Sequence, residues 1–210
     1  MRAALTLALI ASAALATPLV AQSGGGGMAM MKGAGSPAAV AGGTYAVEPN
    51  HTQTSFTVGH MGISPFTGTF AGGSGRLTLD PRRPAATTLQ VSVPVASVRT
   101  TSAKLDEELR SADWLDAGKF PTATFTSTRV TPTGPGTAQV EGTLMLHGVS
   151  RPATLRARFF GAGTNPMSKK ASVGFTGDMT IKRSEFGVTK YVPLVSDETT
   201  LSINAAFEKE

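Results

Sequence analysis

The side chains that could do chemistry are few and lie far apart along the chain. There are three histidines and no cysteine, so a zinc site would need His51, His60 and His147 together, without thiolates. No two of them have the short spacing that places ligands on one strand or helix turn. Three hypotheses remain: a metal-assisted hydrolase, contacts to a lipid phosphate or hydroxyl, and hydrogen-bonded structural histidines. The last is the favoured interpretation.

Arg183 is the second candidate, in the run Lys-Arg-Ser-Glu-Phe-Gly that begins at Lys182. A guanidinium can hold a pyrophosphate through two parallel hydrogen bonds. It can equally pair with a neighbouring carboxylate, here Glu185 or Asp178. The pairing within the protein is slightly favoured.

No arrangement of residues typical of a nucleophilic enzyme is present. The run 72–75 (Gly-Gly-Ser-Gly) lacks the spacing of a nucleophile elbow, and it lacks the Gly-Lys-Ser/Thr of a phosphate loop. Asp113 and Asp116 are three residues apart on an expected helix, where solvated helix ends explain them better than catalysis does. We therefore expect a protein that is not an enzyme.

The charge balance excludes one class of partner. Lys and Arg number 19 against 14 Asp and Glu, and the basic residues are scattered with few aromatics between them. Nucleic-acid binding is not expected from this pattern, although transient contact with an anionic membrane surface is compatible with it. Without cysteine, stability depends on the core and not on disulfides.

The N-terminus has the pattern of an export signal. Arg2 precedes an apolar run that is too short to span a bilayer, and small residues lead to an expected cleavage after Ala21. Residues 1–21 are thus predicted to be a signal peptide, and the protein is predicted to be periplasmic. Residues 22–43, rich in Gly, Ala and Met, are predicted to be a disordered linker. The methionines at 28, 30 and 31 give only a weak indication of copper binding.

From Thr44 to Glu210 short segments alternate apolar and polar residues, with Gly, Pro, Asp or Asn between them. A period of two over many short runs is typical of an antiparallel sandwich or barrel. The segment 102–118 departs from this rhythm and predicts a short amphipathic helical region. Ser102 is its expected N-cap, and Ser111 is expected to cap a second helical turn that holds Trp114.

Five groups of residues occur in an order that is specific when they are taken together. They are Tyr45, His51, Phe56 and His60-Met61-Gly62; Gly68-Thr69-Phe70; the run from Ser97 through Asp106, Leu109 and Asp113-Trp114-Leu115-Asp116 to Phe120-Pro121, Phe125 and Ser127; Gly142, Leu144 and Leu146-His147-Gly148-Val149; and Arg183-Ser184-Glu185-Phe186-Gly187. From about Thr44 to the C-terminus the chain therefore resembles the YceI-like family. It departs from the usual pattern at Thr52, Leu105 and Glu108, where Ser, Arg and His are more common.

The resemblance implies an all-β fold: an eight-stranded, antiparallel, extended lipocalin-like barrel that holds a polyisoprenoid or related long-chain lipid. It implies no cofactor besides that lipid, and a homodimer is compatible with it. The ligand-binding residues expected on this basis are Phe56, Val58, His60, Phe70, Phe125, Leu144, Leu146, Phe175, Arg183 and Phe186. The residue pattern alone also allows a solid core, in which case the protein would be a structural or stress-response protein that binds nothing.

Overall fold

The computed structural model describes residues 36–210. The predicted signal peptide, the methionine cluster and most of the predicted linker lie outside the described residues. The last part of that linker has structure: Pro37–Ala39 form a 3-10 turn (η1) and Val40 is buried in the core. The first strand begins at Gly43, so the ordered domain starts before the predicted boundary at Thr44.

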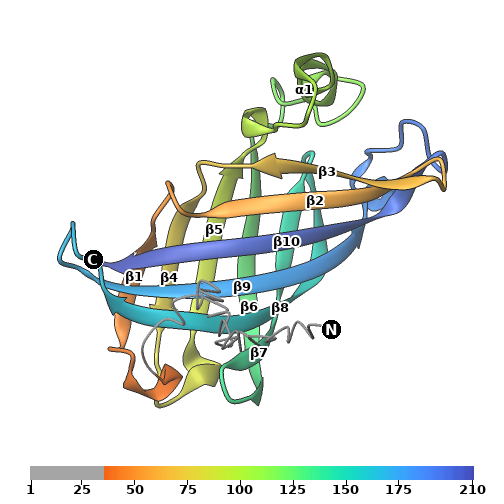
Figure 1. The fold of residues 1–210 in the computed structure, drawn as a ribbon. Helices are drawn as coiled ribbons and strands as arrows, with labels where there is room; N and C mark the ends of the chain where they lie inside the picture. The colour runs from red at the N-terminus through yellow and green to blue at the C-terminus, as the bar shows by residue number, and fades with distance from the viewer. Residues whose placement is uncertain (1–35) are drawn as a thin grey trace, which may run out of the picture. The chain divides into compact units, whose positions relative to one another are not determined.

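Ten strands account for most of the described chain (Figure 1). In chain order they are β1 (Gly43–Val47), β2 (Gln53–His60), β3 (Ser64–Phe70), β4 (Ser74–Leu79), β5 (Thr88–Pro94), β6 (Thr122–Gly134), β7 (Thr137–Leu146), β8 (Val149–Thr164), β9 (Ala171–Lys182) and β10 (Val195–Lys209). Single turns of 3-10 helix lie at Pro84–Ala86 (η2), Val95–Ser97 (η3) and Arg183–Phe186 (η4).

All strand pairs are antiparallel, and together they close into an eight-stranded barrel. The order is β1-β4-β5-β6-β7-β8-β9-β10, and β10 pairs back onto β1. β2 follows β1 along β10, since Val47 faces Phe207 while Gln53 faces Asn204. β4 follows β3 in the chain, and it pairs with β1 as β3 pairs with β2. The β2–β3 and β1–β4 pairs are therefore two halves of one interrupted hairpin. The predicted fold class is confirmed.

The alternation of apolar and polar residues separates the two faces of the wall. On β10, Leu201 and Ile203 line the interior while Ser202 and Asn204 are exposed. The other strands predicted from the sequence follow the same rule, because successive side chains point to opposite faces of a sheet. A barrel of about eight strands can either fill its interior with side chains or hold one small ligand.

The helical region is shorter than predicted. α1 spans Ala103–Arg110, with the Ser102 hydroxyl accepting a hydrogen bond from the Leu105 amide at 3.4 Å, so the predicted N-cap is confirmed. The predicted second helical turn is wrong. Ser111 donates its hydroxyl back to the Glu108 carbonyl at 2.6 Å and ends α1, and the chain continues through turns. Within residues 36–210 no helix has the length and apolar character to cross a membrane.

Two motifs of the resemblance are hairpin turns. His147 and Gly148 have φ of 52° and 74° between β7 and β8, and Met61 and Gly62 have φ of 54° and 68° between β2 and β3. His147 and Gly148 form a two-residue turn of the kind that matches the twist of a hairpin, whereas the β2–β3 connection has three residues, 61–63. These motifs therefore have a conformational role that glycine serves well.

Candidate functional site: an apolar cavity in the barrel

A cavity of about 630 Å³ lies inside the barrel. One end is lined by Leu79, Pro84 and Thr87, around the β4–β5 connection. The other end is lined by residues of the β5–β6 connection, including Glu108 and Trp114. The volume lies within the range of about 300–1,000 Å³ that is usual for small-molecule sites.

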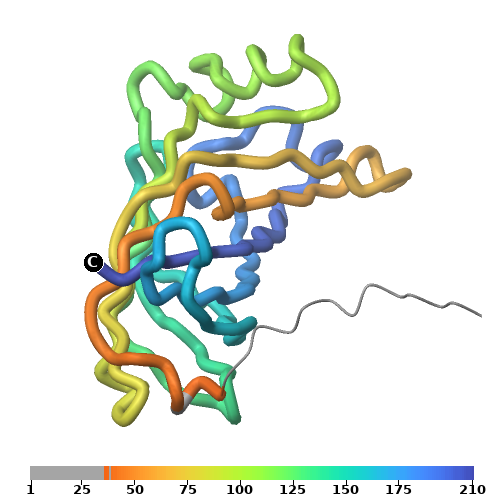
Figure 2. Tube along the Cα trace, turned by 60° about the vertical axis from the view of Figure 1, so that its left-hand side comes forward, coloured from red at the N-terminus to blue at the C-terminus, as the bar shows by residue number. Residues whose placement is uncertain are grey.

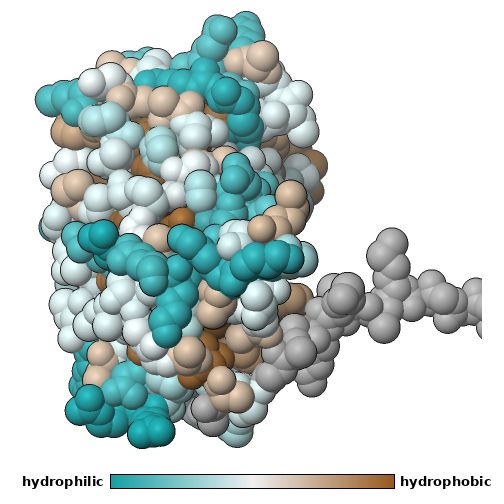
Figure 3. Space-filling view, turned by 90° about the vertical axis from the view of Figure 1, so that its left-hand side faces the viewer, coloured by the Kyte–Doolittle hydropathy of each residue, from teal (hydrophilic) through white to brown (hydrophobic). Residues whose placement is uncertain are grey.

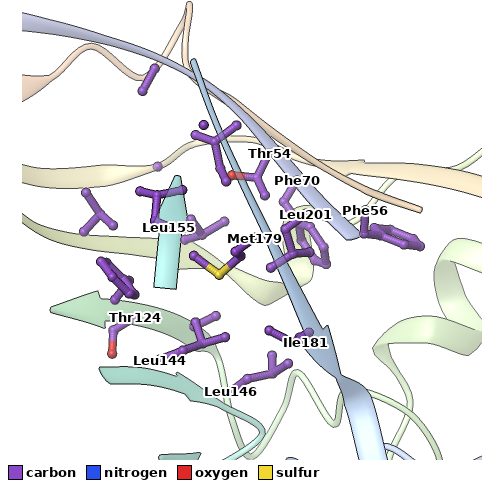
Figure 4. A pocket seen from close by; sticks show the side chains of 18 of the residues that line it. Thr54, Phe56, Phe70, Thr124, Leu144, Leu146, Leu155, Met179, Ile181 and Leu201 are labelled. Carbon is purple, nitrogen blue, oxygen red and sulfur yellow. The ribbon is translucent and has the colours of Figure 1, made fainter. Parts of the chain in front are cut away.

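The cavity wall is almost entirely hydrocarbon. In Figure 4 the side chains of Leu144, Leu155, Met179, Ile181 and Leu201 point into a common space. They come from four different strands, so the space lies between the walls of the barrel and not in a surface groove. Such a lining favours an apolar occupant, because burial of apolar surface stabilises the complex by about 25 cal/mol per Å².

Several inward-facing side chains are only half-buried although they lie inside the wall. Phe56, Val58, Leu201 and Ile203 all line the cavity and keep accessible surface. A close-packed core would remove that surface, since protein interiors are packed about as densely as organic crystals. The interior is therefore hollow, and the solid-core alternative does not describe this barrel.

Nine of the ten predicted ligand-binding residues line the cavity: Phe56, Val58, His60, Phe70, Phe125, Leu144, Leu146, Phe175 and Arg183. Phe186 does not, and the expectation that it belongs to the tunnel wall is wrong. It is 1% exposed and packs within the core cluster of Phe125, Leu144 and Ile181. Phe186 lies in η4, after the end of β9, and not on a strand whose side chains alternate between the two faces. Its ring is therefore buried in the core cluster and does not face the cavity. That the other nine contact a ligand stays a prediction.

Other wall residues were not predicted as site residues. Leu155, Met179, Ile181 and Leu201 could have been found, because each continues the inward face of an expected strand. Trp114 and Tyr191 gave no such signal, since they lie in irregular segments that only the tertiary fold brings to the cavity.

Arg183 is held by the backbone and not by a carboxylate. Its Nε, Nη1 and Nη2 donate to the carbonyls of Ser196, Val188 and Val195 at 2.9, 2.9 and 2.7 Å. The side chain is buried, with the guanidinium 5.5 Å from the Trp114 ring centre. The predicted pairing with Glu185 or Asp178 is wrong, because Asp178 instead pairs with Arg156 and the Arg183 donors are directed at carbonyls.

Burial determines the ionisation properties around Arg183. Loss of solvation lowers the pKa of the Arg183 guanidinium, and the charge of Asp197 opposes that shift. In turn, the Ser184 amide and hydroxyl donate to Asp197 at 2.8 and 2.7 Å and lower the pKa of its carboxyl. Asp197 thus supplies the compensating negative charge without contacting Arg183 directly.

The three histidines do not form a common site. His51 contacts Glu48, with its Nδ1 2.5 Å from the carboxylate, in the β1–β2 connection. His147 Nδ1 lies 3.0 Å from the Phe186 carbonyl, while His60 lies at the far end of β2 from His51. Within residues 36–210 no group of three or more His, Asp or Glu side chains is arranged to hold a metal ion.

The segment between β5 and β6 covers one end of the barrel (Figure 1). We call residues 98–120, which include α1, the lid segment. Val98, Leu109 and Trp114 of this segment form a buried cluster with Val188. Trp114 also donates to Glu108 at 3.1 Å. The lid segment therefore packs against the barrel end through apolar contacts.

Asp106 fixes the start of this lid segment. It is 6% exposed, and its Oδ1 accepts from the Thr100 amide at 2.6 Å and the Thr100 hydroxyl at 2.8 Å. Substituting Asp106→Ala leaves both donors without that partner, so we expect a loss of about 1–3 kcal/mol in unfolding free energy. Hydrogen exchange of the amides in residues 98–110 should accelerate as the lid loosens.

The neighbouring Glu107→Ala is the matched control, because Glu107 is exposed on the same helix. It should change stability by less than about 0.5 kcal/mol. Equal exchange rates in the two variants would show that Asp106 does not anchor the lid segment.

The comparisons with known proteins agree with this architecture. A family model described as the YceI-like domain matches residues 45–207. A protein of Ectopseudomonas mendocina described as a UPF0312 protein is 37% identical over 162 residues, which cover 76% of this chain and 84% of that protein.

Two solved structures share the fold. Burkholderia cenocepacia BcnA superposes with a TM-score of 0.69 at 26% identity, covering 76% of this chain and 98% of that one. A domain of Saccharophagus degradans, described as a polyisoprenoid binding domain implicated in plant cell wall breakdown, has a TM-score of 0.62 at 14% identity and covers 79% and 98%. On the match over residues 45–207, this chain belongs to the YceI-like family.

Proposed function

We propose that this protein binds one long apolar lipid of the isoprenoid type inside the barrel and carries it without chemical change. The observation that carries the proposal is the hydrocarbon-lined cavity of about 630 Å³ between the barrel walls. A related fold described as a polyisoprenoid binding domain supports the choice of ligand class. The export pattern of residues 1–21 supports a periplasmic site of action.

Threonine and serine hydroxyls are spread along the cavity, but its ionisable side chains, Glu108, His60, Arg183 and Tyr191, lie toward the lid segment. Apolar burial supplies affinity along the chain of the ligand, while polar groups at one end fix its orientation. We therefore place the lipid headgroup at the lid end and its hydrocarbon tail toward η2. Glu108, which stands where the family often has His, accepts hydrogen bonds and suits a hydroxyl or amide headgroup better than a phosphate.

Native mass spectrometry of the protein purified without detergent tests this proposal. We expect a bound mass that organic extraction removes, and that returns when the stripped protein is mixed with a prenyl alcohol or a quinone. A stripped protein that takes up neither of these lipids would overturn the proposal. Recovery of the added lipid with unchanged mass after prolonged incubation is expected of a carrier, whereas hydrolysed lipid would indicate an enzyme.

The same experiment determines the oligomeric state. The sequence is compatible with a homodimer, and native mass spectrometry reports subunit number and bound lipid together. One lipid per subunit is expected in either case, because the cavity lies within a single barrel.

A further inference from the structure

Exposed large apolar side chains are concentrated at one end of the barrel. Of the seven in the described residues, five lie on two loops: Met61 (54% exposed) and Ile63 (82%) between β2 and β3, and Tyr191 (54%), Val192 (37%) and Leu194 (61%) before β10. We call these five residues the apolar rim. In Figure 2 the β2–β3 hairpin projects beyond the rest of the barrel.

The two loops form one continuous surface. The Met61 amide donates to the Leu194 carbonyl at 2.6 Å, and Val195 pairs with His60 across the strands. The Val195 amide also donates to the Tyr191 carbonyl at 2.8 Å. Backbone hydrogen bonds therefore hold the rim side chains at the tips of a defined structure.

The rim borders the lipid cavity. Tyr191 belongs to both, since it lines the cavity while half of its surface is exposed. His60 and Val195 also line the cavity and adjoin rim residues in sequence. An apolar path thus leads from the exposed rim to the interior of the barrel.

Charge is sparse around the rim. Residues 60–70 and 188–196 contain no Asp or Glu, and their one Lys or Arg is Lys190. Lys190 is paired with Asp113 at 2.9 Å. The face away from the rim, which is seen in Figure 3, has hydrophilic patches among weakly polar and apolar residues. The two rim loops are, by comparison, almost free of charged side chains.

A lipid membrane fits this surface better than a second copy of the chain does. Stable protein interfaces use about 20–30 residues a side, far more than five side chains on two loop tips provide. Binding to a membrane interface scales with the apolar area that is inserted, so a small cluster of side chains suits reversible docking. Tyrosine is enriched at the headgroup level of membranes, because its ring is amphipathic. Tyr191 of the apolar rim fits that position.

We propose that the apolar rim inserts into a lipid membrane surface and so places the lid end of the cavity at the membrane interface. A lipid tail could then pass between membrane and barrel with little exposure to water. The docking itself needs no lipid in the cavity, so it can be tested independently of the proposed function.

The test is sedimentation with vesicles of phosphatidylcholine, with and without phosphatidylglycerol. The wild type is compared with the double variant Ile63→Asp, Leu194→Asp, all chains having identical N-termini. We expect the vesicle-bound fraction, expressed as a partition coefficient, to fall at least ~10-fold in the variant, because two inserted aliphatic side chains are replaced by charges. The control is Met167→Asp, which is 90% exposed in the β8–β9 connection, at the other end of β9 from the rim. It should bind vesicles as the wild type does.

Three results would overturn the proposal: no binding by the wild type, equal binding by the double variant, or an equal loss in the Met167→Asp control. Light scattering adds a fourth, namely a wild-type dimer that becomes monomeric in the double variant while vesicle binding is unchanged. Lipid uptake from an aqueous dispersion is measured on the same proteins. Vesicle binding without uptake would retain the docking and remove the proposed function, and the reverse would remove only the docking.

Discussion

Substituting Leu201→Trp should reduce binding of a long-chain prenyl lipid at least ~10-fold, equivalent to about 1.4 kcal/mol. Leu201 lines the middle of the cavity beside Met179, its partner on β9 (Figure 4). An indole at this position enters the hollow from the β10 wall and shortens the path that a straight chain can follow. A short prenyl alcohol that fits one side of the obstruction should keep its affinity within about threefold.

The protein should tolerate this change. Overfilling a close-packed core costs about 1–3 kcal/mol, but here the added ring enters space that is not filled by protein. We expect the unfolding free energy to change by less than about 1.5 kcal/mol, which urea denaturation measures. A variant that folds and binds long chains as tightly as the wild type would show that the lipid lies elsewhere.

The adjacent substitution Ser202→Trp is the matched control. Ser202 is on the same strand, but its side chain is exposed on the outer face. The same ring therefore adds its bulk outside the barrel, and lipid affinity should be unchanged. If both variants lost affinity equally, the effect would come from the strand and not from the cavity.

The barrel was predictable because one face of each strand is apolar. Leu201 and Ile203 alternate with the polar Ser202 and Asn204 on β10, and this period of two identifies the inward face whether that face packs or lines a hollow. For the same reason the alternation could not distinguish a solid core from a cavity. The distinction depends on how far the opposite walls stand apart, which the register and tilt of the strands determine.

Local signals were insufficient where the outcome depends on distant parts of the chain. Ser111 has the residue type of an N-cap, yet its hydroxyl ends α1 instead of starting a new helical turn. Phe186 follows the strand β9 in sequence, but a 3-10 turn places it inside the wall. Similarly, nothing in the sequence indicates that β1 and β2 lie end to end along β10, because that arrangement depends on pairing with a strand about 150 residues later.

Arg183 is the clearest example, because its partners are backbone carbonyls, and a sequence does not show where carbonyls point. Substituting Arg183→Met should lower the unfolding free energy by about 3–5 kcal/mol, because three carbonyls lose their donor and each unsatisfied buried group costs about 1–3 kcal/mol. The substitution leaves the carbonyls of Val188, Val195 and Ser196 without their donors. Arg183→Lys should lie between Arg183→Met and the wild type, since one ammonium cannot reproduce the planar geometry of three donors.

Arg156→Met is the control, because Arg156 forms an exposed ion pair with Asp178 on the outer face. Its loss should cost less than about 1 kcal/mol. Urea unfolding of Arg183→Met and Arg156→Met compares the two arginines directly, and similar midpoints would show that water replaces the guanidinium of Arg183 at the three carbonyls. A large loss confined to Arg183 would instead show that this side chain holds the segment 188–196 in place. Because that segment carries Tyr191 and Leu194, the same residue would then maintain both the cavity end and the apolar rim.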